Sequence, residues 1–582
     1  MYESYNDKQI NDDINLVDSL QNKIIEKYYG RIDSDSITPK DLLDFFILYE
    51  TLLKTRYVLN QFPRLAVSAN QNDRDAQKLL NKIRKISTES QVKLSFIQIE
   101  LGNLLKRKKG LLENTELKDY KHFMEKLIRS QPHILSEKEE QIIIEKDRYG
   151  ISTFQQLQNE IVGNVSFTIE IDGEQKIFPF GALKGFQEHP VRMIRKEAIQ
   201  NTFRNLGNQA DTISTSLRSI CGNHVLMTKR RNFTSFMESS YVDNDVNEAM
   251  IDSLLTTILK NTSTFHEFIK LKAKLMETEK LLGEDIYAPI KGLEDLKLSW
   301  NEIKELILET HKEFDESFYQ ASKTMFEENR IDATPKSGKR AGAFCSTDYK
   351  NDKAYILMSF NGNFMDLKTL AHELGHAIHD FLKSKQAFLN RGIPMVTAET
   401  ASEFSTMLVI EKMLERVDDK IKTVILFKQL ENLCTPIFEV TSRVLFEESL
   451  YKSIENGEYL DKEKINELYS EARNKIFEDN VEWLPEQIYE WCWKPHYFRT
   501  DIRFYNYPYS FAELLVLALY AKYRKEGKTF IPKFIEFLGS GSNQSPLDLG
   551  KNILGVDMED PDFWQEGINE FKRILTQLKE FF

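Results

Sequence analysis

Three histidines fall within eight residues of the segment "TLAHELGHAIHDFL", which covers residues 369 to 382. The whole chain of 582 residues contains only ten histidines, so this concentration is unusual. Residues 372 to 376 read His-Glu-x-x-His, and chance predicts about 0.02 such patterns in a chain of this composition. The spacing therefore indicates metal chemistry rather than a solvated helix face.

A helix would bring these side chains together. Apolar residues recur around them at three- and four-residue steps, which predicts a helix with Asp366 as its N-terminal cap. Residues four apart lie one turn above another, so His372 and His376 can bind the same ion. Zinc accepts imidazole nitrogens and in catalytic sites usually keeps three protein ligands and a water. Glu373 stands beside the first ligand, where it can take a proton from that water.

The third protein ligand has two candidates, one helical turn apart. A second predicted helix, residues 395–414, follows about twenty residues later and contains Glu399 and Glu403. A Glu from a following helix completes many sites of this kind. Spacing alone does not choose between the two, and an ordinary surface position is the alternative for both.

The segment "WCWKPHYFRTDIRFYNYPYSF", residues 491–511, is the most aromatic part of the chain. Core packing is one interpretation, because buried tyrosine hydroxyls usually find partners in the interior. The segment also carries polar tips on His496, Tyr505, Tyr507 and Tyr509. Neutral donors of this kind can stabilise negative charge that develops on a substrate oxygen during a reaction.

The elements that must position these residues are mostly helices. Residues 42–62 and 249–276 carry apolar side chains at helical steps, and the chain has only 15 prolines and 24 glycines. Residues 165–180 and 341–360 alternate apolar and polar side chains around a turn, which predicts two hairpins. The second hairpin directly precedes the histidine helix, so we expect a mainly α fold with a small β-sheet beside that helix.

Charge-rich breaks near residues 135–140 and near residue 190 are the candidate domain boundaries. We place the boundary at the second break. This divides the chain into an N-terminal helical region, residues 1–190, and a catalytic region, residues 191–582.

Composition argues against several classes of partner. The net charge is −12 and lysine and arginine are scattered, so we expect no nucleic-acid binding. The N-terminus has no apolar signal segment, and the longest apolar run, "FAELLVLALYAKY", is too short to span a bilayer. None of the four cysteines has C-x-x-C spacing. We expect no membrane association and a cytoplasmic location.

Three motifs together resemble one family. "LAHELGHAIH", "TAETASEF" and "HYFRTDIRFYNYPYSF" are similar to the oligoendopeptidase F branch of the thimet-oligopeptidase-like zinc metallopeptidases. Recognisable motifs run from about residue 190 to residue 520. The resemblance implies a two-lobed helical peptidase with a deep central channel, which admits short unfolded peptides.

The resemblance also assigns roles. It implies one zinc ion per chain, bound by His372, His376 and Glu399, the last as the Glu of an E-x-x-S element. Glu373 is then the catalytic base. The implied oxyanion donors are His496 together with Tyr509 or Tyr507. "GAFCS", residues 342–346, resembles the strand that lines the family's cleft. The implied substrate-binding residues are Gly342, Ala343, Phe344 and Tyr505.

We therefore expect a zinc-dependent endopeptidase that hydrolyses short unfolded oligopeptides through a zinc-bound water activated by a Glu. The alternatives are a carboxypeptidase-type zinc enzyme on a related helical fold and a non-catalytic peptide-binding protein. Two positions depart from the family pattern. Thr406 stands where an acidic residue is expected, and Ala512 stands where glycine is expected.

Overall fold

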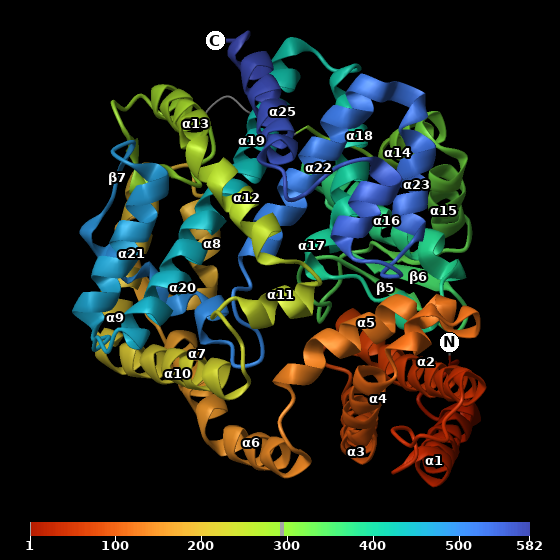
Figure 1. Ribbon diagram of the computed structural model, residues 1–582. Coiled ribbons are helices and arrows are strands. Elements are labelled where there is room, and N and C mark those ends of the chain that lie inside the picture. The colour runs from red at the N-terminus through yellow and green to blue at the C-terminus, as the bar shows by residue number, and fades with distance from the viewer. Residues whose placement is uncertain (1, 291–295) are drawn as a thin grey trace. The chain divides into compact units, whose positions relative to one another are not determined.

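The computed structural model describes residues 2–290 and 296–582. The chain forms two compact units, each built from three stretches of sequence, and each unit is described by itself. Unit 1 comprises Met1–Ile134, Asp295–Val417 and Lys522–Asp557. Unit 2 comprises Leu135–Glu294, Asp418–Ala521 and Met558–Phe582. Helices make up most of both units, which confirms the prediction of a mainly α protein (Figure 1).

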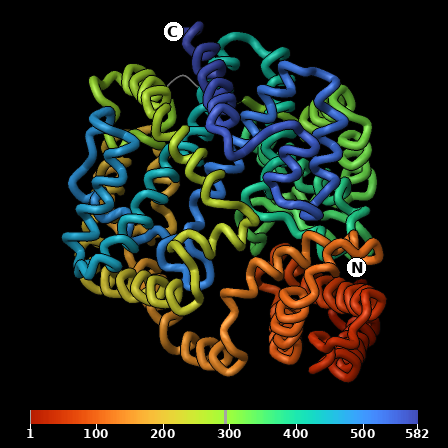
Figure 2. The backbone as a smooth tube through the Cα atoms, in the orientation of Figure 1, coloured from red at the N-terminus to blue at the C-terminus, as the bar shows by residue number. Residues whose placement is uncertain are grey.

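The tube in Figure 2 shows the separate stretches of unit 1, from red at the N-terminus through green to blue. Its helices are α1 (Lys8–Tyr28), α2 (Pro39–Ala69), α3 (Arg74–Lys93), α4 (Phe96–Arg107), α5 (Lys121–Ser130), α14 (Trp300–Phe314), α15 (Glu316–Glu327), α16 (Phe364–Leu382), α17 (Met395–Ala398), α18 (Thr400–Leu414), α23 (Ile531–Gly539) and α24 (Pro546–Leu549). Its strands are β4 (Ile331–Asp332), β5 (Phe344–Asp348) and β6 (Lys353–Leu357).

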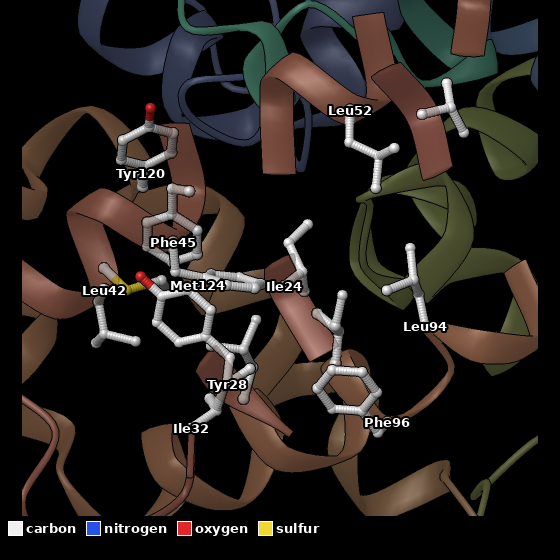
Figure 3. Close-up of a cluster of buried hydrophobic side chains, with 14 of the residues drawn as sticks. Ile24, Tyr28, Ile32, Leu42, Phe45, Leu52, Leu94, Phe96, Tyr120 and Met124 are labelled. Atoms are coloured by element: carbon white, nitrogen blue, oxygen red, sulfur yellow. The ribbon is translucent and has the colours of Figure 1, made fainter. Parts of the chain in front are cut away.

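The N-terminal helices of unit 1 share one apolar core (Figure 3). Tyr28 from α1 meets Phe45 from α2 edge to face, with ring centroids 5.1 Å apart. Phe96 from α4 and Met124 from α5 are buried in the same cluster. Edge-to-face aromatic pairs of this kind add about 0.5–1.5 kcal/mol beyond their burial. Helices α2 and α3 both contribute buried residues to this core, which fixes their positions in unit 1.

A small sheet lies beside α16, as the sequence predicted. Its strand order is β4-β6-β5, with β5 and β6 antiparallel, which confirms the hairpin expected in residues 341–360. In this sheet β5 pairs only with β6, so its other edge has no strand partner among the described residues. Because side chains alternate along a strand, Cys345 and Thr347 share one face of β5. Thr347 hydrogen-bonds to Asp380 of α16, so this face packs against the histidine helix.

The N-cap of the histidine helix lies three residues earlier than the sequence suggested. Asn363 is its N-cap and accepts a hydrogen bond from the backbone N–H of Asp366, at 3.0 Å. Asp366 returns the interaction by accepting from the backbone N–H of Asn363, at 3.1 Å. Placing the cap at Asp366 was therefore wrong, because this aspartate fills the third position of a capping box.

Helices α16 and α18 pack unusually closely, and Gly375 is the reason. A Cβ atom on Gly375 would lie 2.4 Å from the Cα of Ser402 and 2.6 Å from the carbonyl oxygen of Ala401. Both obstacles are backbone, which cannot rotate away. Any larger residue at position 375 would push the two helices apart.

Unit 2 contains the helices α6 (Glu137–Tyr149), α7 (Ile151–Gly163), α8 (Leu183–Gln187), α9 (Arg192–Gly207), α10 (Ala210–Arg230), α11 (Glu238–Asn244), α12 (Glu248–Lys260), α13 (Thr262–Leu275), α19 (Asp419–Cys434), α20 (Val440–Glu455), α21 (Lys462–Phe477), α22 (Tyr507–Glu526, whose last residues belong to unit 1) and α25 (Pro561–Lys579). Its strands are β1 (Ser166–Ile171), β2 (Glu174–Pro179), β3 (Leu281–Leu282) and β7 (Val481–Glu482).

The first predicted hairpin is also confirmed. Strands β1 and β2 pair antiparallel, and Asp172 and Gly173 form the turn between them. Both turn residues have positive φ angles, 56° and 80°. A turn with two positive φ angles matches the twist of the flanking strands, and Asp-Gly is a favoured pair for it. The boundary proposed near residue 190 stays a prediction. No helix of the described residues is both long and apolar enough to cross a membrane.

Candidate metal centre and active site

Three predicted ligands converge in unit 1. His372 and His376 come from α16, and Glu399 lies at the junction between α17 and α18. Glu399 Oε2 is 3.2 Å from His372 Nε2 and 3.2 Å from His376 Nε2. Among the described residues, these three form a group whose candidate ligand atoms all lie within 4.8 Å of one another.

The spacing of these atoms fits zinc. Ligands about 2.0–2.1 Å from a tetrahedral ion lie about 3.3 Å apart, close to the two distances observed here. Two imidazole nitrogens and one carboxylate oxygen are also a donor set that zinc uses in catalytic sites. The donor chemistry and the geometry therefore both suit this metal.

Glu403 has a different place in the site. It lies 3.0 Å from Nδ1 of His372, on the opposite side of the ring from Glu399. A carboxylate on the second ring nitrogen fixes the tautomer and the orientation of a ligating histidine. Ser402 similarly donates a hydrogen bond to Glu399 Oε2, at 2.9 Å. The two glutamates that spacing could not separate thus contact the same imidazole through different nitrogens.

The electrostatics of the group favour a cation. Burial alone would lower the pKa of His372, but hydrogen bonds to Glu399 and Glu403 outweigh it and raise the pKa to about 10. Burial would raise the pKa of Glu399, yet hydrogen bonds from the two histidines hold it well below its usual range. The two carboxylates thus stabilise positive charge beside the imidazoles. A metal ion that binds there releases such protons.

Glu373 lies beside the candidate ligands in sequence and is largely buried. Burial raises the pKa of its carboxyl above the ordinary value for Glu, although the two neighbouring histidines partly oppose that effect. Glu373 lines a cavity of about 470 Å³ in unit 1, together with the three ligand residues. A carboxylate in this position can exchange a proton with a molecule held in the cavity.

The segment before β5 contributes part of the cavity wall. Ala343 and Phe344 line it, whereas Gly342 precedes them with a φ of +83°. This backbone angle favours glycine. A role for all three residues in substrate binding stays a prediction.

His379 has a different environment from the other two histidines of α16. It is buried, and burial lowers its pKa well below the usual range. The candidate metal group does not include it. His372 and His376 are only partly buried, so the three histidines of the helix do not share one environment.

A buried chain of hydrogen bonds connects the backbone of α16 to side chains of α18, α14 and α15. Ser405 of α18 donates to the carbonyl oxygen of Ala371, the residue before the first ligand, at 2.8 Å. His311 of α14 contacts Ser405 through Nε2 at 2.9 Å and Ser322 through Nδ1 at 2.8 Å. Because the Ser405 hydroxyl hydrogen is already donated to Ala371, His311 must donate from Nε2 and accept at Nδ1. Nothing in the sequence pattern pointed to this chain.

The predicted aromatic residues gather separately in unit 2. The imidazole of His496 stacks on Tyr505, with ring centroids 5.2 Å apart and planes inclined by 18°. Tyr505 in turn meets Tyr509 edge to face at 5.5 Å. Burial, aided by nearby cationic side chains such as Arg443, lowers the pKa of His496 to about 4. The ring is therefore neutral near pH 7, as a donor to a developing oxyanion should be.

Tyr507 lies apart from that stack. It is fully buried at the start of α22, and its hydroxyl donates to the carbonyl oxygen of Ser240 at 3.0 Å. The same hydroxyl accepts hydrogen bonds from Ser240 Oγ at 3.1 Å and Asn244 Nδ2 at 3.2 Å. These contacts favour a packing role. Pro508 occupies the first turn of α22, where a missing N–H costs nothing.

Comparison with known proteins identifies the fold and the family. The family model for "Peptidase family M3" matches residues 186–570, and the model "Oligopeptidase F" matches residues 106–167. The first match spans well over half of the chain. It includes both the metal-ligand group of unit 1 and the aromatic segment of unit 2.

Individual relatives carry related names. Oligopeptidase PepF of Bacillus subtilis is 28% identical over 92% of this chain and 82% of its own length. An oligoendopeptidase F homolog of Lactococcus lactis is 28% identical over 81% of this chain and 78% of its own. The crystal structure of oligoendopeptidase-F from Enterococcus faecium shares the fold, with a TM-score of 0.73, 21% identity and 99% coverage of both chains.

Proposed function

Since the chain belongs to peptidase family M3, in its oligopeptidase F branch, we propose that it is a zinc endopeptidase of short unfolded peptides. The observation that carries this proposal is the convergence of His372, His376 and Glu399 around one point, with Glu373 lining the same cavity. One zinc ion per chain is proposed to bind there.

Each side chain then has a role. Zinc, when bound, supplies a Lewis acid that lowers the pKa of a coordinated water and polarises the scissile carbonyl. Glu373 accepts the proton of the attacking water at its carboxylate and later gives it to the leaving amine nitrogen. His496 and Tyr509 donate hydrogen bonds to the carbonyl oxygen as its negative charge grows.

The substrate is proposed to be a short peptide in extended form. Ala343 and Phe344 contribute to the wall of the metal-site cavity, and Tyr505 supports His496. By family resemblance the proposed substrates are peptides of about five to twenty residues. A stably folded protein should resist digestion.

The test combines metal analysis with product analysis. The purified chain should contain about one zinc per molecule, and a chelator should abolish activity that added zinc restores. It should cleave an internally quenched peptide blocked at both ends. Release of C-terminal residues from unblocked peptides alone would favour a carboxypeptidase-type enzyme. Tight peptide binding without any cleavage would favour a non-catalytic binding protein.

A further inference from the structure

Unit 1 contains a second cavity, of about 600 Å³, beside the metal site. Its walls come from α2, α3, β5 and the segment that precedes β5. The two cavities share four lining residues, namely Phe344, Cys345, Tyr349 and Asp380. The two cavities therefore lie next to each other in unit 1.

Three arginines line this second cavity. Arg64 lies on α2, Arg84 on α3 and Arg340 just before β5. All three are exposed, and none forms an ion pair among the described residues. The chain as a whole carries twelve more acidic than basic residues, so this local excess of positive charge runs against the bulk composition.

The cavity supplies little negative charge of its own. Asp380 is its one acidic lining residue in the described part of the chain. That carboxylate already pairs with Lys383 at 2.7 Å and accepts a hydrogen bond from Thr347. The three guanidinium groups therefore face a cavity whose protein atoms do not neutralise them.

A backbone hydrogen bond holds the segment of Arg340 close to that of Arg64. The N–H of Arg340 donates to the carbonyl oxygen of Ser68, at 2.8 Å, which attaches the loop before β5 to the end of α2. Arg64 lies one helical turn before Ser68, on the same face of α2. The guanidinium of Arg340 also lies over the ring of Phe344, 5.3 Å from its centroid. Because Phe344 lines both cavities, this contact joins the arginine group to the metal site.

We propose that the arginine-lined cavity binds a carboxylate of the peptide substrate. Guanidinium groups match carboxylates in shape and can form two parallel hydrogen bonds to one of them. The carboxylate comes either from an acidic side chain or from the free C-terminus, since both present the same group. This inference deepens the proposed function and rests on it, because it describes how the same active site selects its substrates.

The experiment uses three internally quenched peptides of equal length. The first is neutral and blocked at both ends, the second is identical but has a free C-terminal carboxylate, and the third is amidated but carries one glutamate at scanned positions. The variants are Arg64→Glu, Arg84→Glu and Arg340→Glu. Arg74→Glu is the matched control, since Arg74 is an exposed arginine of α3 that does not line the cavity.

We expect the wild-type chain to bind at least one of the two carboxylate peptides about three- to tenfold more tightly than the neutral peptide, the range of one or two partly exposed charge pairs. Each of the three variants should reduce or abolish this preference, and Arg74→Glu should preserve it. Dependence on C-terminal amidation identifies the terminus as the source, and dependence on glutamate position identifies a side chain. A preference that survives in all three variants, or the absence of any preference, overturns the proposal.

The proposed function can fail separately. Failure to cleave any of the three peptides sinks the endopeptidase proposal. Binding of the same peptides to the Glu373→Gln chain, measured by fluorescence anisotropy, still tests the arginine cavity in that case. Melting curves of each variant confirm that the exposed substitutions leave the fold intact.

Discussion

The metal-ligand group of unit 1 and the aromatic segment of unit 2 hold their polar atoms in opposite ways. Among the candidate ligands, His372 has Glu403 on its second ring nitrogen, and Glu399 accepts a hydrogen bond from Ser402. His496, in contrast, is held by stacking on Tyr505, and its Nδ1 has no hydrogen-bond partner among the described residues. The two ligand residues thus have hydrogen-bonded supports, whereas His496 keeps one ring nitrogen without such a support.

This difference matches two kinds of chemistry. A metal site gains affinity when a second layer of hydrogen bonds fixes its ligands. A donor that meets charge only in the transition state gains nothing from a permanent partner in the protein. Substitutions in the two regions should therefore fail in different ways, and the following predictions test that contrast from the largest effect to the smallest.

The largest effect is expected at Glu373. Replacing it with Gln preserves the shape of the side chain and removes the proton acceptor, so kcat should fall by about 10²–10⁴-fold. Zinc content and melting temperature should stay near those of the wild type. Steady-state kinetics and metal analysis on one preparation measure both. Activity close to that of the wild-type chain would refute the general-base role.

The next effect concerns the aromatic segment. His496→Phe and Tyr509→Phe each remove a donor while keeping a ring in place. If these groups stabilise the oxyanion, kcat should fall by about 10²–10³-fold with little change in KM. Zinc should remain bound. If both variants keep the wild-type kcat and only the melting temperature of His496→Phe changes, the segment merely packs.

The next prediction concerns zinc affinity and the two glutamates that contact His372. Glu399→Ala removes a proposed ligand and should strip most of the zinc. Glu403→Ala removes only the carboxylate on the other ring nitrogen and should weaken zinc binding by about 10–100-fold. Competition with a zinc chelator of known affinity gives both values. The ligand assignment fails if the metal is lost from Glu403→Ala and kept by Glu399→Ala.

The same two glutamates show which parts of the site could be predicted from the sequence and which could not. The four-residue spacing of His372 and His376 predicted convergence because both residues share one helix, whose geometry is known. Glu399 and Glu403 lie on a second helix, and nothing in their spacing states how that helix packs against the first. Gly375 determines the packing, since only glycine lets the backbone of α18 approach so closely.

Contacts between distant parts of the chain could not be predicted. His311 reaches Ser405 across 94 residues of sequence, and the backbone of Arg340 bonds to that of Ser68. Each depends on how several helices pack, and no local pattern encodes it. The capping box at Asn363 and Asp366, in contrast, follows a local rule, although the prediction placed the cap at the wrong one of its two residues.

The hydrogen-bond chain behind α16 predicts a pH effect on stability. Burial lowers the pKa of His311 to about 3, whereas the unfolded chain binds a proton at the ordinary value of 6.5. The unfolded state therefore binds more protons below pH 6.5, and this residue should cost up to about 1.4 kcal/mol of stability per pH unit between pH 6.5 and 3. That is about a tenfold change in the folding equilibrium for each unit.

Denaturation of His311→Gln provides the comparison for this effect. The amide can hydrogen-bond to the two serines but does not titrate. Its stability should therefore fall less steeply than that of the wild-type chain as the pH drops below 6.5. Both chains are measured without metal, so that the zinc ligands contribute equally. Parallel curves for the two chains would show that His311 is not the titrating group.

The smallest catalytic effect is expected at Tyr507, which the sequence could not distinguish from Tyr509. The Tyr507 hydroxyl makes three buried hydrogen bonds to Ser240 and Asn244. Tyr507→Phe leaves those partners unsatisfied and should destabilise unit 2 by about 1–3 kcal/mol. Its kcat should change by less than about twofold, because no bond to substrate is lost.

Tyr509→Phe should give the reverse, with a lower kcat and nearly unchanged stability, since 37% of Tyr509 is exposed. Paired kinetic and melting measurements on the two variants test this crossed pattern. If Tyr507→Phe lowers kcat at constant stability, its hydroxyl must leave its partners on α11 to meet the substrate, and the packing role of Tyr507 is wrong.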